Sequence, residues 1–297
     1  GDCIACHVPH ISEHEKLLSA DGDDLCFKCH TDRKDEFERT YVHEPVKKDC
    51  TICHDPHGSE TANHLRNRKD ENGNYISVAQ PIRELCLGCH RKLYPEVVDQ
   101  IENGKVHHDP VFEGECTICH TPHSTNYKKQ LKAPLTDICY SCHEKMKELI
   151  TGRLYKHGPV RTDDCAQCHL VHGSANNHLL RANFPEEYSV KFDIDSYTLC
   201  FNCHNQETVL EKKTETTGFR NGRDNLHYFH VVSKGRSCRT CHEIHASDQE
   251  FHMQKKIPFS KNFTITLKFA VTPDGGNCTE GCHKPKKYDR IKPEINK

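Results

Sequence analysis

The sequence predicts a fold that is mostly irregular, with short α-helices and a few small β-hairpins, wrapped around a core that its own side chains do not supply. The chain has 297 residues, and 34% of them are hydrophobic when its 20 cysteines are counted. Without the cysteines, roughly 27% of the residues are apolar, well below the share in an ordinary globular domain. So polar a chain cannot fill conventional cores. Either it is disordered or something other than side chains occupies its interior.

The cysteines occur in pairs, and a histidine directly follows every pair. Nine pairs have the spacing C-x-x-C-H, and the tenth has the spacing C-x3-C-H. In chain order the motifs are Cys3, Cys6 and His7; Cys26, Cys29 and His30; Cys50, Cys53 and His54; Cys86, Cys89 and His90; Cys116, Cys119 and His120; Cys139, Cys142 and His143; Cys165, Cys168 and His169; Cys200, Cys203 and His204; Cys238, Cys241 and His242; Cys278, Cys282 and His283. They use all 20 cysteines, so none is left for a disulfide.

C-x-x-C-H is the attachment motif of c-type haem. The two thiols form thioethers with the haem vinyl groups, and the histidine binds the iron from one side. Zinc knuckles and thioredoxin-like redox pairs also use C-x-x-C, but neither needs a histidine after every second cysteine. The sequence therefore predicts ten covalently attached haem c groups, stacked as the core of the molecule. A chain built in this way should stay unfolded without haem.

The second axial position of each iron is predicted to hold another histidine. Fifteen histidines lie outside the motifs, whereas methionine, the usual alternative, occurs only twice. Ligation by two histidines gives lower potentials than ligation by histidine and methionine. It also leaves no open iron position for a substrate, which favours electron transfer over catalysis.

Two groups of histidines recur at fixed offsets from the motifs. The first group follows the motif histidine by three residues, too close to reach the opposite face of its own haem, so each member should bind a neighbouring haem. The second group precedes a motif by seven or eight residues, and in three of its members a proline two positions on favours an extended approach. The first group is His10, His57, His123, His172 and His245, and the second is His43, His108, His157 and His230.

The motifs alternate between two kinds, which divide the chain into five units of two haems, beginning near residues 1, 43, 108, 157 and 227. Motifs with the extra histidine read as loops. The others should begin helices, over 23–39, 82–101, 135–150 and 196–213, with Asp, Ser or Thr as N-caps. A period of 113 to 115 residues between corresponding cysteines indicates a duplicated four-haem module, 1–107 and 108–226, followed by a two-haem unit, 227–297. Strand-like runs at 74–78, 187–194 and 262–269 should form hairpins outside the haems.

The expected location is outside the cytoplasm. The sequence contains no apolar run near 18 residues, so no membrane span is predicted. It opens two residues before a haem motif, as a trimmed mature form would. Covalent haem attachment takes place outside the cytoplasmic membrane, so the protein should be exported, to the cell surface or beyond, with the periplasm or outer membrane as alternatives. Haem propionates would make the holoprotein acidic, which disfavours nucleic acid as a partner.

The repeated pattern C-x-x-C-H-x-P-H-G-S followed by L-C-x-x-C-H resembles the doubled-CxxCH family of multihaem c-type cytochromes over essentially the whole chain. The resemblance extends to two kinds of relative. One is the extracellular cytochrome filaments, or nanowires, of metal-reducing prokaryotes, and the other is a decahaem conduit inside an outer-membrane porin. It implies haems that alternate between stacked and T-shaped contacts, and redox partner cytochromes or extracellular electron acceptors as partners. The C-x3-C-H motif and the first unit, which lacks an upstream histidine, depart from the pattern.

Three functions are compatible with these features: a polymeric electron-conducting filament, a monomeric or porin-embedded conduit, and a multihaem oxidoreductase. The enzyme needs a five-coordinate haem, often marked by C-x-x-C-K, which does not occur here; the chain is therefore expected not to be an enzyme. The two groups supply nine second ligands for ten haems. The tenth comes either from a spare histidine of the same chain or from a neighbouring subunit in a head-to-tail assembly. The candidate for a shared ligand is His14, and the other spare histidines are His64, His107, His178, His227 and His252.

Overall fold

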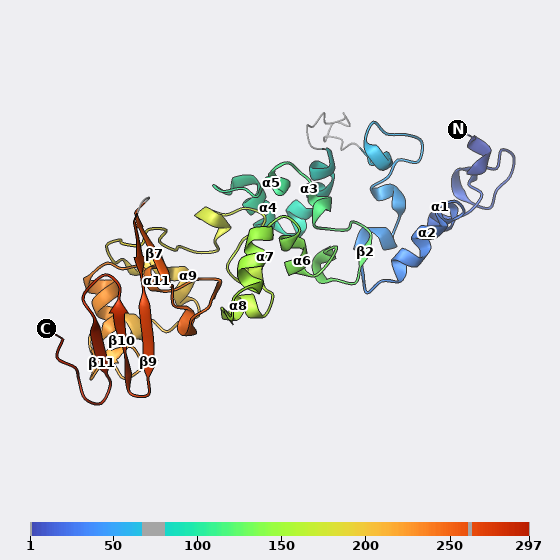
Figure 1. Ribbon diagram of the computed structural model, residues 1–297. Coiled ribbons are helices and arrows are strands. Elements are labelled where there is room, and N and C mark those ends of the chain that lie inside the picture. The colour runs from blue at the N-terminus through green and yellow to red at the C-terminus, as the bar shows by residue number, and fades with distance from the viewer. Residues whose placement is uncertain (1, 67–80, 261–262, 297) are drawn as a thin grey trace. The chain divides into compact units, whose positions relative to one another are not determined.

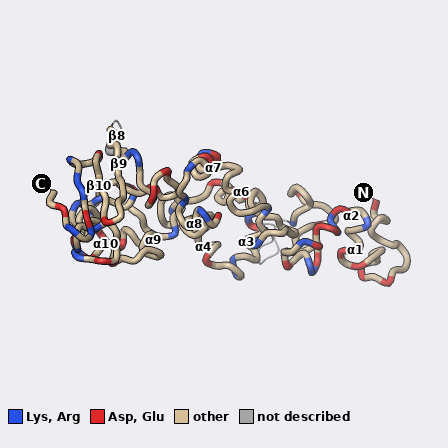
Figure 2. Tube along the Cα trace, turned by 60° about the horizontal axis from the view of Figure 1, so that its bottom comes forward, with Lys and Arg blue, Asp and Glu red and all other residues tan. Residues whose placement is uncertain are grey.

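The computed structural model of the chain describes residues 2–66, 81–260 and 263–296. The chain forms two compact units, Gly1–Ser141 and Cys142–Lys297, and their boundary falls inside the sixth motif. The modules 1–107, 108–226 and 227–297 rest on sequence periodicity instead and stay a prediction. Charged side chains of both signs lie along the whole described trace (Figure 2).

The first unit consists of short helices joined by loops and single 3₁₀ turns (Figure 1). Its α-helices are α1 (Gly22–Phe27), α2 (Thr31–Lys34), α3 (Pro81–Leu93), α4 (Pro95–Asn103), α5 (Asp109–Phe112) and α6 (Leu135–Tyr140), and its strands are β1 (Tyr41–Val42) and β2 (Ser124–Thr125). The 3₁₀ turns are η1 (Cys3–Ala5), η2 (Glu15–Leu17), η3 (Asp35–Glu38), η4 (Glu44–Lys47), η5 (Cys50–Ile52), η6 (Ala62–His64), η7 (Cys116–Ile118) and η8 (Lys128–Gln130).

The second unit repeats this pattern and adds three small antiparallel sheets. Its helices are α7 (Glu144–Thr151), α8 (Gly158–Arg161), α9 (Thr198–Phe201), α10 (Glu207–Leu210) and α11 (Cys238–Cys241), with 3₁₀ turns η9 (Cys165–Gln167), η10 (Asn177–Leu179), η11 (Ile194–Tyr197) and η13 (Glu250–His252) and the π-helical segment η12 (Tyr228–Ser233). Its strands are β3 (Tyr155–Lys156), β4 (Arg220–Asn221), β5 (Asp224–Asn225), β6 (Ala246–Ser247), β7 (Lys256–Ser260), β8 (Phe263–Thr266), β9 (Lys268–Thr272), β10 (Gly275–Glu280) and β11 (Lys286–Asp289). The three added sheets are β4-β5, β7-β8 and β11-β10-β9.

All four segments predicted to be helical contain helices. They form α1, α2 and η3, then α3 and α4, then α6 and α7, and finally η11, α9 and α10. The prediction of Asp, Ser or Thr N-caps is wrong at α1, α6 and α9, where the preceding residue makes no side-chain cap hydrogen bond, whereas Asp193 caps η11 by accepting from Asp195 N–H. In α1 the carboxylate of Asp23 is used differently, since it accepts a hydrogen bond from the Cys50 thiol at 3.0 Å.

Three of the four upstream histidines lie in extended backbone directly before a helical turn that carries proline at its start, whereas His230 lies within the π-helical segment Tyr228–Ser233. The φ/ψ values are −65°/126° at His43, −91°/121° at His108 and −58°/147° at His157, before η4, α5 and α8 respectively. Proline disfavours helical backbone before it and suits the first helical turn after it. The predicted extended approach of these histidines is therefore confirmed.

The strand predictions have three different outcomes. Residues 262–269 include β8 and β9, which are strands as predicted but belong to separate sheets, β7-β8 and β11-β10-β9. The hairpin predicted at 187–194 is wrong: there Ser189 makes a single bridge to Arg236. The Tyr188 carbonyl accepts hydrogen bonds from Ser237 N–H and from the Thr240 hydroxyl. This segment therefore pairs with the ninth motif instead of folding back on itself. Residues 74–78 lie outside the described residues.

The tenth motif lies on a strand, which accounts for its unusual spacing. Cys278 is part of β10 and pairs with Phe269 of β9, and the next paired residue is Glu280, so the register shifts by one residue between them. A β-bulge accommodates one extra residue in a strand, and Thr279 is that residue. The additional position in C-x3-C-H is therefore absorbed by the bulge.

Buried apolar side chains form only small clusters among the described residues. One joins Tyr197, Val209 and Val231. The other joins Met253, Ile257 and Leu267. These clusters lie in the second unit, around the eighth to tenth motifs. No helix in the described ranges is long and apolar enough to cross a bilayer.

The five motifs with the extra histidine continue into a closed loop that recurs almost unchanged. We call these the motif loops: residues 7–18, 54–65, 120–131, 169–180 and 242–253. In each, the motif histidine makes an antiparallel bridge to the residue eleven positions later. The ninth and tenth residues after that histidine have φ between 52° and 60°, although none is glycine. Such backbone is unfavourable for ordinary residues, so the loop must be held by its hydrogen bonds.

A hydroxyl five residues after the motif histidine ties each motif loop together. In the fifth of these loops, buried Ser247 donates to the Met253 carbonyl at 2.7 Å and accepts from Gln249 N–H at 3.0 Å. The same two bonds recur at Ser12, Ser59, Thr125 and Ser174. Because the spacing is constant, these loops present their backbone carbonyls at constant places.

We predict that Ser247→Ala destabilises the second unit. The substitution leaves the half-buried Gln249 N–H without its partner and the buried Met253 carbonyl with only a 3.4 Å contact from Gln249 Nε2. An unsatisfied buried polar group costs about 1–3 kcal/mol. The midpoint of thermal unfolding of the haem-loaded protein should therefore fall. Ser12→Ala removes the same bonds at a half-buried position, where water replaces them, and should change the midpoint much less. Equal effects of the two substitutions would contradict this account of the loops.

Candidate haem-binding sites

The motif loops hold one nitrogen of each motif histidine and leave the other for a metal. In every loop the Nδ1 atom lies within hydrogen-bond distance of the carbonyl oxygen nine residues later. The pairs are His7 with Lys16 at 2.9 Å, His54 with Asn63 at 2.8 Å, His120 with Lys129 at 2.9 Å, His169 with His178 at 2.9 Å and His242 with Phe251 at 2.8 Å. A carbonyl only accepts, so Nδ1 carries the proton and Nε2 is the free metal ligand. The unusual backbone of the loops is what turns these carbonyls toward the ring.

In the first unit, three pairs of histidines from distant parts of the sequence face each other. The ring centroids of His7 and His57 are 6.1 Å apart, with the planes inclined by 13°. The centroids of His54 and His123 are 6.1 Å apart, and those of His43 and His90 are 6.2 Å apart.

The second unit contains the corresponding arrangement. His157 and His204 have centroids 6.1 Å apart and nearly parallel rings, at 6°. His169 and His245 are 6.3 Å apart at 7°, and His230 and His283 are 6.4 Å apart at 35°.

These separations fit a haem iron. Two imidazoles that bind one metal from opposite sides, each through a nitrogen about 2 Å from it, have ring centroids roughly 6 Å apart. In each of the six pairs found among the described residues, one ring belongs to a haem-attachment motif and the other to one of the two predicted groups. The residues present therefore suit a haem in which the motif holds the porphyrin edge and the paired histidines hold the iron.

The two groups of partner histidines come from different places along the chain. The histidines that follow a motif face the loop motif of the preceding two-haem unit. They are His57, His123 and His245. Those that precede a motif, His43, His157 and His230, face the second motif of their own unit. The extra histidines thus lie beside a neighbouring haem motif, as the spacing predicts, and each joins two consecutive units.

Backbone pairing brings the two groups together. β1 pairs with β2 and β3 pairs with β6, both antiparallel. His43 N–H donates to the His123 carbonyl at 2.8 Å, and His157 N–H donates to the His245 carbonyl at 3.0 Å. The Nδ1 atom of His43 also lies 2.8 Å from the Pro122 carbonyl. An upstream histidine is thus oriented by the motif loop of the next unit.

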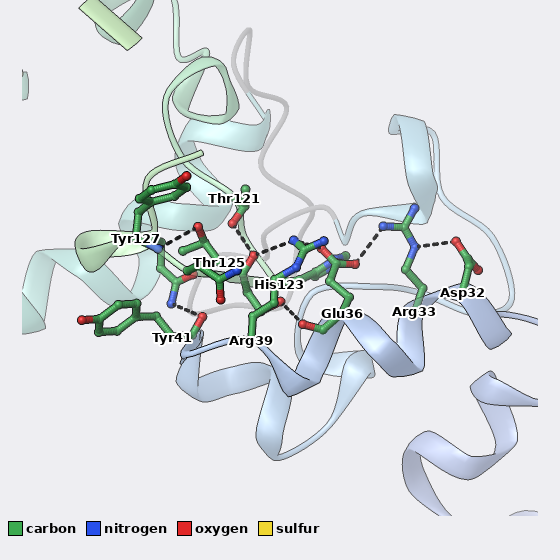
Figure 3. Close-up of polar contacts among 12 residues, drawn as sticks. Asp32, Arg33, Glu36, Arg39, Tyr41, Thr121, His123, Thr125 and Tyr127 are labelled. Atoms are coloured by element: carbon green, nitrogen blue, oxygen red, sulfur yellow. Dashed lines mark hydrogen bonds and ion pairs between the residues drawn. The ribbon is translucent and has the colours of Figure 1, made fainter. Parts of the chain in front are cut away.

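A carboxylate orients His123 in the first unit (Figure 3). Its Nδ1 lies 3.6 Å from Glu36, and Glu36 also binds Arg33 at 2.9 Å. Arg39 donates to the Ser124 carbonyl at 3.3 Å, which fastens the segment after α2 to the loop that carries His123. Carboxylates in this position fix the ring of a metal-binding histidine and raise its basicity.

Burial favours the neutral, metal-binding form of several of these histidines. It is the main cause that lowers the pKa of each of the following: His90, His120, His123, His157, His230, His242 and His245. A neutral imidazole offers the lone pair that iron needs.

A cysteine of one motif often lies close in space to a cysteine of the next motif along the chain. The thiols of Cys26 and Cys50, of Cys86 and Cys116, and of Cys200 and Cys238 lie close enough to shift each other's pKa, and they bring together the second and third, the fourth and fifth, and the eighth and ninth motifs. Close neighbours also join the third motif to the fourth, the seventh to the eighth and the ninth to the tenth, through Cys53 and Cys89, Cys168 and Cys203, and Cys241 and Cys282. Since the thioethers hold the porphyrin edge, neighbouring cysteines bring neighbouring porphyrins close.

The sequence places His227 only among the spare histidines, because it belongs to neither positional group. Burial, followed by the nearby His242 and His230, lowers the pKa of His227 to about 4. Its Nδ1 lies 3.3 Å from the Thr217 hydroxyl. It is thus the candidate partner of His242, and its burial beside a motif, which no spacing reveals, is the signal that finds it.

The other predicted ligands stay predictions. His14 directs Nδ1 to Asp21 at 2.9 Å, and His10 is exposed. Neither has a ring pairing of the kind described above within the described chain. His108 and His172 have contacts in the structure, and their role as iron ligands is likewise a prediction.

Comparison with known proteins agrees with this reading of the motifs. A family model described as the doubled CXXCH motif matches residues 1–35, 43–94, 108–148 and 157–209. The multiheme cytochrome MtrA of Shewanella baltica (strain OS185) is 27% identical over 265 residues, which cover 83% of this chain and 68% of the relative. The high-molecular-weight cytochrome c of Nitratidesulfovibrio vulgaris (strain Hildenborough) is 24% identical over 303 residues, which cover 95% of this chain and half of that relative. The chain belongs to the doubled-CXXCH family of multihaem c-type cytochromes, whose paired motifs bind haem covalently.

Proposed function

We propose that the chain carries ten haems, each bound by two histidines, and conducts electrons along them in the order of the motifs. The observation that carries this proposal is the set of paired imidazoles, with ring centroids 6.1 to 6.4 Å apart, at six of the ten motifs. When bound, haem supplies an iron that exchanges single electrons. The chain holds that iron with two imidazoles, which leaves no position for a substrate and favours transfer over catalysis.

The order of the motifs supplies the path. Within the first unit, neighbouring cysteines connect motifs two, three, four and five. Within the second unit, they connect motifs seven, eight, nine and ten. Electrons would therefore pass between haems that are consecutive in the sequence. The scarcity of buried apolar side chains supports the further proposal that the porphyrins are the core around which the chain is wrapped.

We further propose that copies of the chain assemble head to tail as an exported, extracellular filament. Charge complementarity supports this assembly: residues 2–39 contain ten acidic and five basic residues, whereas 282–296 contain two acidic and five basic residues (Figure 2). Ile4 and Ile11 in the acidic segment and Ile291 and Ile295 in the basic segment are exposed. A monomeric or porin-embedded conduit, which passes electrons between partner cytochromes, is the alternative.

Iron ligation can be tested with His57→Ala. The parent protein should show only low-spin ferric haem by electron paramagnetic resonance. The variant should show one high-spin haem per chain, because the iron bound through His7 loses its opposite imidazole, and added imidazole should restore the low-spin signal. The control is His64→Ala, which removes an exposed histidine of the same segment and should leave all haems low-spin. A stoichiometric high-spin signal in the parent, or none in His57→Ala, would refute the assignment.

Assembly can be tested by reversing charges in the acidic segment. Asp24 and Asp35 are exposed, and their joint replacement by Lys should shorten or abolish filaments seen by negative-stain electron microscopy. Added salt should weaken the parent filaments, since it screens exposed charges. The control reverses two exposed charges elsewhere, Glu96→Lys with Glu207→Lys. Particles of one fixed size in the parent at low salt would favour the conduit instead.

The proposed shared ligand has its own test. If His14 is donated across the junction, His14→Ala should both shorten the filaments and produce one high-spin haem per chain. Short filaments with ten low-spin haems would mean that His14 contacts the neighbouring subunit but does not bind its iron. Unchanged filaments would mean that His14 does not lie at the junction between subunits.

A further inference from the structure

Two of the motif loops receive an upstream-histidine strand, and the same position in both loops faces that strand. The loop 120–131 pairs with β1, and the loop 242–253 pairs with β3. The tenth residue after the motif histidine, at the tip of the loop, is Gln130 in one and His252 in the other. Both have left-handed backbone, with φ of 56° and 55°. The His252 ring lies beside that of His157, and the Gln130 amide reaches the Tyr41 carbonyl of the strand that leads to His43.

Each of these two side chains has a buried polar atom without a hydrogen-bond partner among the described residues. His252 has an unpartnered Nδ1, and its ring lies 5.6 Å from that of His157 in a T-shaped contact. Gln130 donates from Nε2 to the Tyr41 carbonyl at 3.4 Å, and its Oε1 is unpartnered. Buried polar atoms in native proteins are nearly always paired, so the unpartnered Nδ1 of His252 points to a partner that accepts a hydrogen bond.

The ring of His252 is not placed to bind the iron itself. His157 already faces His204 at 6.1 Å with nearly parallel rings, whereas His252 meets His157 edge-on at 76°. His252 also lies close enough to His242 to influence it electrostatically. It therefore stands between the eighth and ninth motifs, beside the axial ligand of one and the motif histidine of the other.

We propose that His252 donates a hydrogen bond from Nδ1 to a propionate carboxylate of the haem held between His157 and His204. The inference rests on the proposed function, because it requires haem at this site. Every haem brings two carboxylates, and a carboxylate close to protein needs donors to offset its desolvation. A donor draws negative charge away from the iron, which stabilises the ferrous form.

The test is His252→Leu in the haem-loaded protein. Leucine is suitable because Leu17 and Leu179 occupy the same loop position with φ of 56°. In a potentiometric titration, the reduction potential of one of the ten haems should fall by about 59 mV. This corresponds to a tenfold shift of its one-electron equilibrium toward the ferric form. All haems should stay low-spin, because no axial ligand is removed.

Two further variants decide the result. His252→Gln keeps a donor, as the chain does at Gln130, and should retain most of the parent potential. His64→Leu changes the same position of an exposed loop, where φ is 52°, and should leave all potentials unchanged. Unchanged potentials in His252→Leu, an equal shift in His64→Leu, or a new high-spin haem in His252→Leu would each overturn the proposal. If His252→Leu loses haem, the retained potential in His252→Gln decides. A high-spin parent would instead refute the proposed function.

Discussion

The proposed binding of one iron by two imidazoles on opposite faces requires a fixed distance between two rings, and six histidine pairs of this chain meet that requirement. His57 lies opposite His7 and His123 opposite His54, so each pair joins one unit to the next. Conventional hydrophobic contacts have little part in this, because the buried apolar clusters are small and lie around the last three motifs. Tertiary structure follows from which histidine reaches which motif.

The motif loops meet this constraint with backbone instead of side-chain packing. A constant carbonyl holds Nδ1 of the motif histidine, a constant hydroxyl closes the loop, and two residues per loop accept left-handed backbone. The same loops then pair with β1 and β3, which carry His43 and His157. One short structure therefore orients a motif histidine, presents an extra histidine to the preceding unit and receives the strand of an upstream histidine. In the proposed function, repeated use of this loop would place haems one after another in sequence order.

Prediction from the sequence succeeded where the signal is local. Helices after the second motif of a unit, loops after the first and extended backbone at His43, His108 and His157 all follow from spacing and from proline. The hairpin at 187–194 failed, because the segment's partner is the distant ninth motif, and strand propensity does not name a partner. At α1 the N-cap residue is Asp21, which makes no side-chain cap bond, and Asp23 lies inside the helix and accepts from a cysteine thiol of another motif.

The candidate site divides in the same way. Regular offsets found the histidines of both groups, and the structure places six of them opposite motif histidines. Three other residues have no such offset, and only tertiary contacts reveal their significance. His227 lies near His242 and Thr217. Glu36 contacts His123, and His252 contacts His157. Groups that tune or complete a site lie outside the repeat, so a repeat analysis cannot find them.

The most direct test of the central claim is to locate the irons in the haem-loaded protein, by anomalous diffraction at the iron edge. The account predicts an iron midway between the rings of each of the six histidine pairs. It also predicts that irons of consecutive motifs are nearest neighbours within each unit. An iron placed away from these pairs, or nearest neighbours that skip motifs, would contradict it.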